Sequence, residues 1–317
     1  MRIRIPSALQ GLILFTASLA GCGGGAGSAN ALIESGAEKA RAGQIAAAMD
    51  DFRAAVAADP NNAVAHYKVG LGLYEGGDYK QAVISLGKAV ELNPRLTDAY
   101  LALGNAYLKQ DDRRSAFLAF NEAVLNDPEN PLALFNLGVL HYMAGKFGDA
   151  DRLLEKARRL RADDPEILYR SGMTKLNLGV LPDAVELLRK SVELKPDNAD
   201  AWLNLGSCLL TLQKVDEARA PLEKALELRP GWSDALNGRG VLEQAEGKDA
   251  EALGSFQQAL AADPNNARVR LNLGVLYEKQ GKTQEALAEY ERYLQQSRDD
   301  VTSAEGVRKR IEALKRR

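Results

Sequence analysis

The chain has 317 residues, with 41 Lys and Arg against 43 Asp and Glu, and a hydrophobic share of 46%. This balance is typical of an ordered, water-soluble protein, and a net charge of −2 offers no basic field for a phosphate backbone, so nucleic acid is not an expected partner. Two Cys and two His are too few and too scattered for zinc, haem or iron–sulfur sites, so we expect no metal and no other cofactor.

The first 21 residues have the form of an export signal. Two arginines precede an apolar run over residues 8–20, and these 13 residues are fewer than the ~20 that a bilayer-spanning helix needs. The run ends in Leu19-Ala20-Gly21-Cys22, which resembles the lipobox of bacterial lipoproteins. The resemblance implies cleavage before Cys22 and acylation of its thiol, palmitate being one such chain. An ordinary secretory signal with a chance cysteine is the alternative.

The segment over residues 22–28 is rich in glycine and is expected to form a flexible tether behind the anchor. Several acyl chains on one cysteine hold a protein durably to a membrane. Gly23 after the cysteine resembles the type of lipoprotein sent to the outer membrane, so we expect a location there, facing the periplasm, with the inner membrane as the alternative. With Cys22 acylated, Cys208 has no disulfide partner and is expected to be a buried free thiol.

The rest of the chain repeats with a period of 34 residues. A glycine recurs at this interval without a gap at Gly36, Gly70, Gly104, Gly138, Gly172, Gly206, Gly240 and Gly274. Twelve residues later stands an alanine, and four further on a large apolar residue, at Phe52, Leu86, Phe120, Leu154, Leu188, Leu222, Phe256 and Tyr290. Most units close with a proline, which cannot continue a helix, so each unit predicts two helices and a stop.

A glycine inside a helix costs about 1 kcal/mol relative to alanine, so its presence in every unit implies a close approach by the second helix. The alanine column is the expected facing surface, and the Phe/Leu column is expected to fill the wider gap one turn on. A third small column, which includes Ala55, Ala89 and Ala123, is assigned to packing against the next unit.

The Gly, Ala, Phe-like, Ala and Pro columns of this 34-residue unit resemble the tetratricopeptide repeat. Eight repeats fit, and they cover 29–300, divided as 29–62, 63–96, 97–130, 131–164, 165–198, 199–232, 233–266 and 267–300. The resemblance implies an all-α fold, a right-handed superhelical α-solenoid of about eight helix hairpins. Residues 301–317 predict a basic capping helix, with contact to anionic lipid or an acidic partner as the alternative.

The sequence has no motif typical of an enzyme active site. His66 and His141 lie alone in apolar columns of different repeats, where a histidine is most often a packed side chain. The sequence has no G-x-S-x-G motif and no Gly-rich phosphate loop after a strand. The repeats and the cap leave no room for a catalytic domain, so we expect no enzyme activity. An enzyme with an unrecognised site is the remote alternative.

Function is therefore expected on the repeat surface. The resemblance implies that the first helices line a concave groove with the second, fifth, sixth, ninth, twelfth and thirteenth residues of each repeat. The candidate groove residues are Tyr67, Lys68, Tyr74, Asn105, Phe135, Asn136, Tyr142, Tyr169, Arg170, Asn204 and Asn272. Aromatic residues gather here in repeats two to five, either as partner contacts or as rings that pack under the next helix.

From the fourth repeat on, asparagine occupies the sixth position of every second repeat, at Asn136, Asn204 and Asn272. A carboxamide offers a donor and an acceptor, so such a row can hold the main chain of an extended peptide, while plain solvation is the alternative. Lys68, Ala102, Arg170 and Gly238 interrupt the row. The clamp of basic residues and asparagines typical of chaperone-binding relatives is absent.

Together these features predict a non-enzymatic, lipid-anchored scaffold of the bacterial cell envelope that binds extended or helical protein segments in its groove. The expected role is assembly of an envelope complex, with pilus or secretion secretins, cell-wall hydrolases and exopolysaccharide export as candidates. The alternative is a glycan or small-molecule module that uses the rings of Tyr67, Tyr74, Tyr142 and Tyr169. The oligomeric state is left open.

Overall fold

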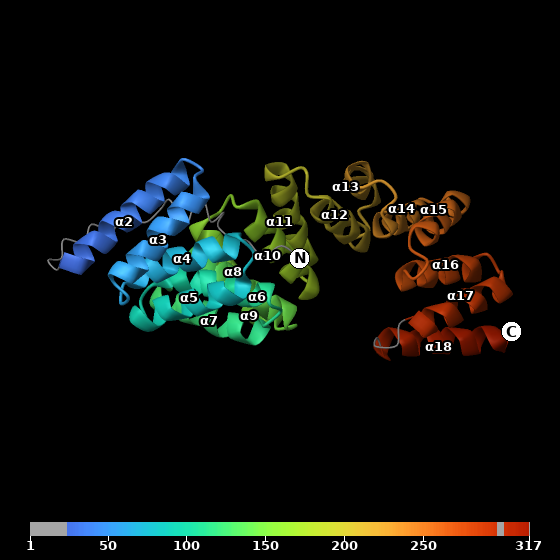
Figure 1. The fold of residues 1–317 in the computed structure, drawn as a ribbon. Helices are drawn as coiled ribbons and strands as arrows, with labels where there is room; N and C mark the ends of the chain where they lie inside the picture. Colours follow the sequence, from blue (N-terminus) through green and yellow to red (C-terminus); the bar gives the residue numbers. More distant parts are fainter. Residues whose placement is uncertain (1–23, 297–300, 317) are drawn as a thin grey trace. The chain divides into compact units, whose positions relative to one another are not determined.

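The computed structural model describes residues 24–296 and 301–316, and within these ranges every regular element is an α-helix. The chain divides between Ala162 and Asp163 into two units. Figure 1 labels the helices of both units. Unit 1 contains α2 (Gly24–Arg41), α3 (Ile45–Ala58), α4 (Ala63–Glu75), α5 (Tyr79–Leu92), α6 (Thr97–Lys109), α7 (Arg113–Asn126), α8 (Pro131–Met143) and α9 (Phe147–Leu160).

Unit 2 contains the remaining helices of the described chain. They are α10 (Pro165–Asn177), α11 (Leu181–Leu194), α12 (Ala199–Thr211), α13 (Val215–Leu228), α14 (Ser233–Ala245), α15 (Asp249–Ala262), α16 (Ala267–Lys279), α17 (Thr283–Gln296) and α18 (Val301–Lys315). In both units each even-numbered helix up to α16 packs on the odd-numbered helix that follows it. The predicted all-α solenoid of helix hairpins is confirmed.

Short polar residues and glycines set the ends of these helices. Asn62, Asn130 and Asn198 precede first helices, and their side chains accept hydrogen bonds from the free N–H groups of the first turn. The turn inside a hairpin needs one residue with positive φ, which Gly77 supplies at 82°. In two repeats Asp111 and Gln213 adopt the same conformation, at 59° and 60°. The hairpin geometry is therefore kept where the glycine is missing.

The glycine column lies against the second helix of the same hairpin. A Cβ added to Gly104 would lie 2.5 Å from the Phe120 ring, and one added to Gly70 would lie 2.5 Å from Cγ of Leu86. The alanine column faces the glycines with its backbone, as at Gly36, where the Ala48 carbonyl oxygen would lie 3.1 Å from an added Cβ. The large side chain one turn further on lies directly over the glycine, because only a residue without a Cβ leaves room for a buried ring or leucine there.

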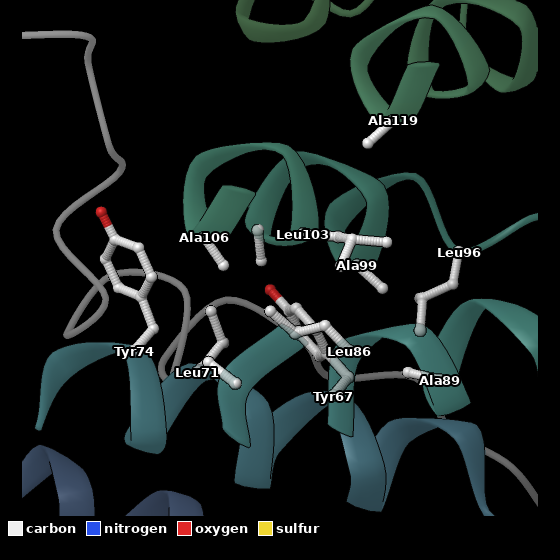
Figure 2. Packing of buried hydrophobic residues seen from close by; sticks show 12 residues of the cluster. Tyr67, Leu71, Tyr74, Leu86, Ala89, Leu96, Ala99, Leu103, Ala106 and Ala119 are labelled. Carbon is white, nitrogen blue, oxygen red and sulfur yellow. The ribbon is translucent and has the colours of Figure 1, made fainter. Parts of the chain in front are cut away.

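The third small column packs against the following repeat, as expected. Ala89 belongs to one buried cluster with Leu96 and Ala99, at the junction with the next repeat. Figure 2 shows this cluster from close by, with Tyr67 of α4 directed toward Ala99, Leu103 and Ala106 of α6. Small side chains at this contact let neighbouring hairpins approach closely.

The expected tether is a helix in the part that the structure describes, because α2 begins at Gly24 and includes residues 24–28. The segment has no proline, and it continues without a break into Ala29, which is fully buried with Ala55 and Ala65; this packing keeps the segment helical in spite of its three glycines. The export signal over residues 1–21, with Cys22, lies outside the described residues.

The C-terminal helix covers the last hairpin. Val307, Ile311 and Leu314 of α18 are buried against Tyr290 and Tyr293 of α17. The basic side chains of α18 also meet acids: Arg310 lies 2.9 Å from Glu278, Lys315 lies 3.2 Å from Glu291, and Lys309 lies 2.7 Å from Glu305. These contacts favour the interpretation of α18 as a cap over that as a lipid-binding segment.

Cys208 is fully buried in α12 and is a free thiol, in agreement with the sequence. Burial raises its pKa to about 11, so the thiol stays protonated at neutral pH. Among the described residues, none of the helices combines the length and the hydropathy that crossing a membrane requires.

Candidate functional site

The predicted groove residues of unit 1 lie on the first helices α4, α6 and α8, and most are deeply buried. The exposed fraction is 4% for Tyr67, 1% for Lys68, 6% for Tyr74, 4% for Asn105, 1% for Phe135 and 1% for Asn136. Tyr142, near the end of α8, is half-buried. Neighbouring first helices contact one another, α4 with α2 and with α6.

Lys68 is a buried cation on this face. Its Nζ lies 5.4 Å from the centre of the Tyr67 ring, and it interacts electrostatically with Asp98 at the start of α6. Burial lowers the pKa of Lys68 to about 8, while attraction to Asp98 acts in the opposite direction. Burial also raises the pKa of Asp98, and Lys68 partly offsets that change. Sequence reasoning missed Asp98, although it is an acid at the second position of a repeat.

Three polar side chains on this face have buried atoms without a hydrogen-bond partner. They are the hydroxyl of Tyr74, the carbonyl oxygen Oδ1 of Asn105, and both Oδ1 and Nδ2 of Asn136. The three residues come from successive first helices, α4, α6 and α8. An unsatisfied buried polar group costs about 1–3 kcal/mol, and these atoms lack the partners that buried polar groups normally have.

The other two asparagines, in unit 2, are already partnered. Asn204 donates through Nδ2 to the Asp200 carbonyl at 2.7 Å and to the Tyr169 hydroxyl at 3.4 Å. Asn272 donates through Nδ2 to Oδ1 of Asn237 at 2.9 Å. In both pairs the asparagine at the sixth position bonds to the fifth residue of the preceding repeat.

This spacing explains why Asn136 has no partner. The residue that corresponds to Tyr169 and Asn237 is Leu101, which stands 35 positions before Asn136 and has no acceptor. Sequence reasoning missed the role of Leu101, although comparison of the fifth and sixth columns would have found it. Of the three predicted asparagines, only Asn136 has both amide atoms buried and without a hydrogen-bond partner within the described chain.

The remaining predicted residues make contacts inside their own unit. The rings of Tyr74 and Tyr142 pack against Tyr79 and Phe147, each pair with centres 5.4 Å apart. In unit 2, Arg170 donates to Glu166 at 3.0 Å and lies over the half-buried ring of Tyr169 at 5.1 Å. The rings therefore belong in part to the packing of the hairpins.

The two histidines form no joint site. Nε2 of His66 lies 2.9 Å from the Pro60 carbonyl oxygen, and the ring of His141 meets the edge of Phe117 with centres 5.3 Å apart. Burial lowers the pKa of His141, against the attraction of Asp149. In the ranges 24–296 and 301–316 no group of three or more His, Cys, Asp or Glu side chains could hold a metal ion.

The repeated hairpins and their first-helix face define a helical-repeat scaffold for protein interactions. A model of the C-terminal domain of cilia and flagella-associated protein 70, a domain of tetratricopeptide repeats (TPRs), matches residues 8–240, and a general tetratricopeptide-repeat model matches residues 244–311. The chain belongs to the tetratricopeptide-repeat family. No curated protein matches it significantly.

Solved structures support the same fold. PilF of Pseudomonas aeruginosa is 21% identical with a TM-score of 0.58, over 69% of this chain and 97% of PilF. YrrB, described as a TPR protein with an unusual peptide-binding site, is 23% identical with a TM-score of 0.53, over 58% of this chain and 95% of YrrB. TTC0263, a thermophilic TPR protein of Thermus thermophilus, is 26% identical with a TM-score of 0.50, over 58% of this chain and 98% of TTC0263.

Proposed function

We propose that this chain binds an extended protein segment on the first-helix face of unit 1, and that Asn136 is the main anchor for the segment. The observation that carries the proposal is the amide of Asn136, whose donor and acceptor are both buried and both unpartnered. A peptide unit presents one N–H and one C=O, which are the two groups that the amide lacks.

Asn105 and Tyr74 extend the same polar row along the neighbouring first helices. Each offers one unpartnered oxygen, so a segment that crosses α8, α6 and α4 would meet hydrogen-bonding groups on all three. Main-chain bonding of this kind holds a peptide while leaving its side-chain sequence largely free. YrrB is a TPR protein with a peptide-binding site, and this use of the same fold supports the proposal.

Peptide binding by the chain tests this proposal. Peptides selected from a random library on the purified protein should bind to wild type, and Asn136→Ala should weaken their Kd by about tenfold or more in calorimetry, since at least one hydrogen bond in a buried site is lost. Asn204→Ala is the matched control and should change the Kd little, because its amide already donates to Asp200 and Tyr169. Equal losses in the two variants, or no peptide selected, would refute the proposal.

We also propose that the chain is held to a membrane of the bacterial envelope through acylated Cys22, in the outer membrane and facing the periplasm, where it brings the bound segment to an envelope complex. The support is the Leu19-Ala20-Gly21-Cys22 motif behind a short apolar run. A single anchored cysteine with two or three acyl chains is sufficient for stable attachment.

Substitution of the anchor cysteine tests the location. In bacterial cells Cys22→Ser should shift the chain from the membrane fraction to the soluble fraction or leave it unprocessed, and labelled palmitate should no longer be incorporated. Cys208→Ser is the control and should keep both attachment and label, because that thiol is buried. Membrane attachment that survives Cys22→Ser contradicts acylation at this residue.

The glycan-binding alternative is less well supported. It requires free aromatic faces on which a sugar can stack, whereas the rings of Tyr74 and Tyr142 already pack on the rings of Tyr79 and Phe147. We therefore give preference to the protein segment.

A further inference from the structure

The outer side of α5 and α7 in unit 1 carries an unusual set of exposed hydrophobic residues. Ile84, Leu118 and Leu125 are 63%, 58% and 65% exposed, whereas the other exposed large hydrophobic residues of the described chain reach at most 45%. Ile84 and Leu118 stand 34 positions apart, at the same place in consecutive repeats. This surface lies on second helices and does not include the residues proposed to bind a segment.

A groove lies beside Ile84. It has a volume of about 580 Å³ and is lined by residues of α3, α4 and α5. Its apolar residues include the half-buried Val56, Val69 and Val83. Arg53 and Lys88 lie at its edge: Lys88 pairs with Glu91 at 2.9 Å, and Arg53 is 3.8 Å from the exposed Asp50.

Gly87 lines this groove, and because it has no side chain, the backbone of another molecule can approach closely there. An added Cβ would meet nothing within 4 Å, so packing inside the chain does not require a glycine here. The same position holds Arg53, Asn121 and Glu155 in the neighbouring repeats, and a charged or amide residue in the other four. A glycine inside α5 makes the helix less stable than an alanine would, and contact with another backbone would offset this loss.

The neighbouring helix α7 carries a surface that fits this groove. Leu118, Glu122 and Leu125 are spaced by four and three residues, so they lie along one face of the helix. All three are exposed, and Glu122 makes no ion pair with the described residues. An apolar ridge with a central acid thus complements an apolar groove with basic edges.

From this complementarity we propose that a second copy of this chain docks here, with the α7 ridge of each copy in the α3–α5 groove of the other. Because groove and ridge are neighbours on one unit, the contact is reciprocal about a two-fold axis, the usual arrangement of a homodimer. In this dimer Leu118 and Leu125 cover Val56, Val69 and Val83, Glu122 meets Arg53 or Lys88, and Gly87 admits the partner's backbone.

Analytical ultracentrifugation of the full chain with Cys22→Ser tests the proposal. The chain that carries only Cys22→Ser should be a dimer at about 100 µM. Addition of Gly87→Gln should raise the dissociation constant of the dimer by about tenfold or more. That variant should stay folded, because the added side chain enters open space and glutamine favours helix. Leu118→Glu combined with Leu125→Glu should act in the same direction, whereas Leu160→Glu, at a residue 45% exposed on α9, should leave the dimer intact.

Charge-reversal variants test which charged residues pair across the proposed dimer interface. Glu122→Lys should weaken the dimer, and Lys88→Glu in the same chain should restore part of the loss, since the reversed charges meet across the interface. A monomer at all concentrations, or a dimer that Gly87→Gln leaves unchanged, would overturn the proposal. Binding of the monomeric chain to lipid vesicles through Leu118 and Leu125 would overturn it as well, in favour of a membrane contact.

Discussion

Phe120→Ala should lower the free energy of unfolding by about 3–5 kcal/mol, the usual range for removal of a buried phenylalanine. The ring is fully buried in the cluster that joins α7 to α6 and α8, with Ala123, Ala133 and Leu137. Its edge lies over Gly104, where no Cβ intervenes. Urea unfolding followed by circular dichroism measures the loss.

Gly104→Ala tests the same contact from the other side. In the wild-type chain the added Cβ would approach the ring to 2.5 Å, and such overpacking costs about 1–3 kcal/mol. In the Phe120→Ala background the same change should instead gain up to about 1 kcal/mol, because alanine favours helix over glycine. Gly254→Ala, where nothing lies within 4 Å, is the control and should stabilise in both backgrounds. Strictly additive effects of Gly104→Ala and Phe120→Ala would contradict the observed contact.

The free energy of unfolding should rise by about 2 kcal/mol between pH 7 and pH 9.5 on account of Lys68. Burial lowers the pKa of Lys68 from its ordinary value of 10.5 to about 8 in the folded chain. Between these two values the unfolded chain holds more protons than the folded chain, so stability increases with pH. Below pH 8 both states are protonated, and the full cost of burying the cation is present.

The measurement is a series of denaturant titrations across this range of pH. Lys68→Met combined with Asp98→Asn should remove the rise, because both members of the buried pair are neutralised. Lys88→Met, at a side chain 40% exposed, should keep it. The series is measured in a Cys208→Ser background, because burial raises the pKa of that thiol to about 11 and its ionisation in the unfolded chain opposes the rise within the same range. The window ends at pH 9.5 because burial also raises the pKa of Tyr67, whose ionisation in the unfolded chain destabilises the protein at higher pH. A flat profile in the wild type contradicts the burial of a charged Lys68.

The fold was predictable because its determinants recur every 34 residues. Each glycine, alanine and proline column repeats one local constraint, so a period in the sequence becomes a period of helices, and first helices begin at Ala63, Thr97 and Pro131 at that interval. The tether over residues 22–28 was wrong from Gly24 on, because glycine content describes local flexibility and not the packing that holds a helix such as α2.

The candidate site was predictable only in outline. The columns indicated which residues face inward, but whether an inward asparagine is available depends on the side chain 35 positions earlier, which is Tyr169 for Asn204 and Leu101 for Asn136. The pKa of Lys68 likewise depends on its burial and on Asp98 of the next hairpin. These contacts join different positions in different repeats, so a comparison of the residues at a single repeat position does not reveal them.

The family, the number of hairpins and the pairing of helices followed from the order of residues alone, because short-range helix stops and small residues at fixed spacing specify them. Three properties emerged only from the packed hairpins: which polar groups stay unpartnered, that the large side chain lies directly over each glycine of the repeat, and that α5 and α7 expose an apolar surface. The reason is that hydrogen bonding and burial are set by neighbours across the interfaces between hairpins, and the distances there are fixed only once the hairpins pack.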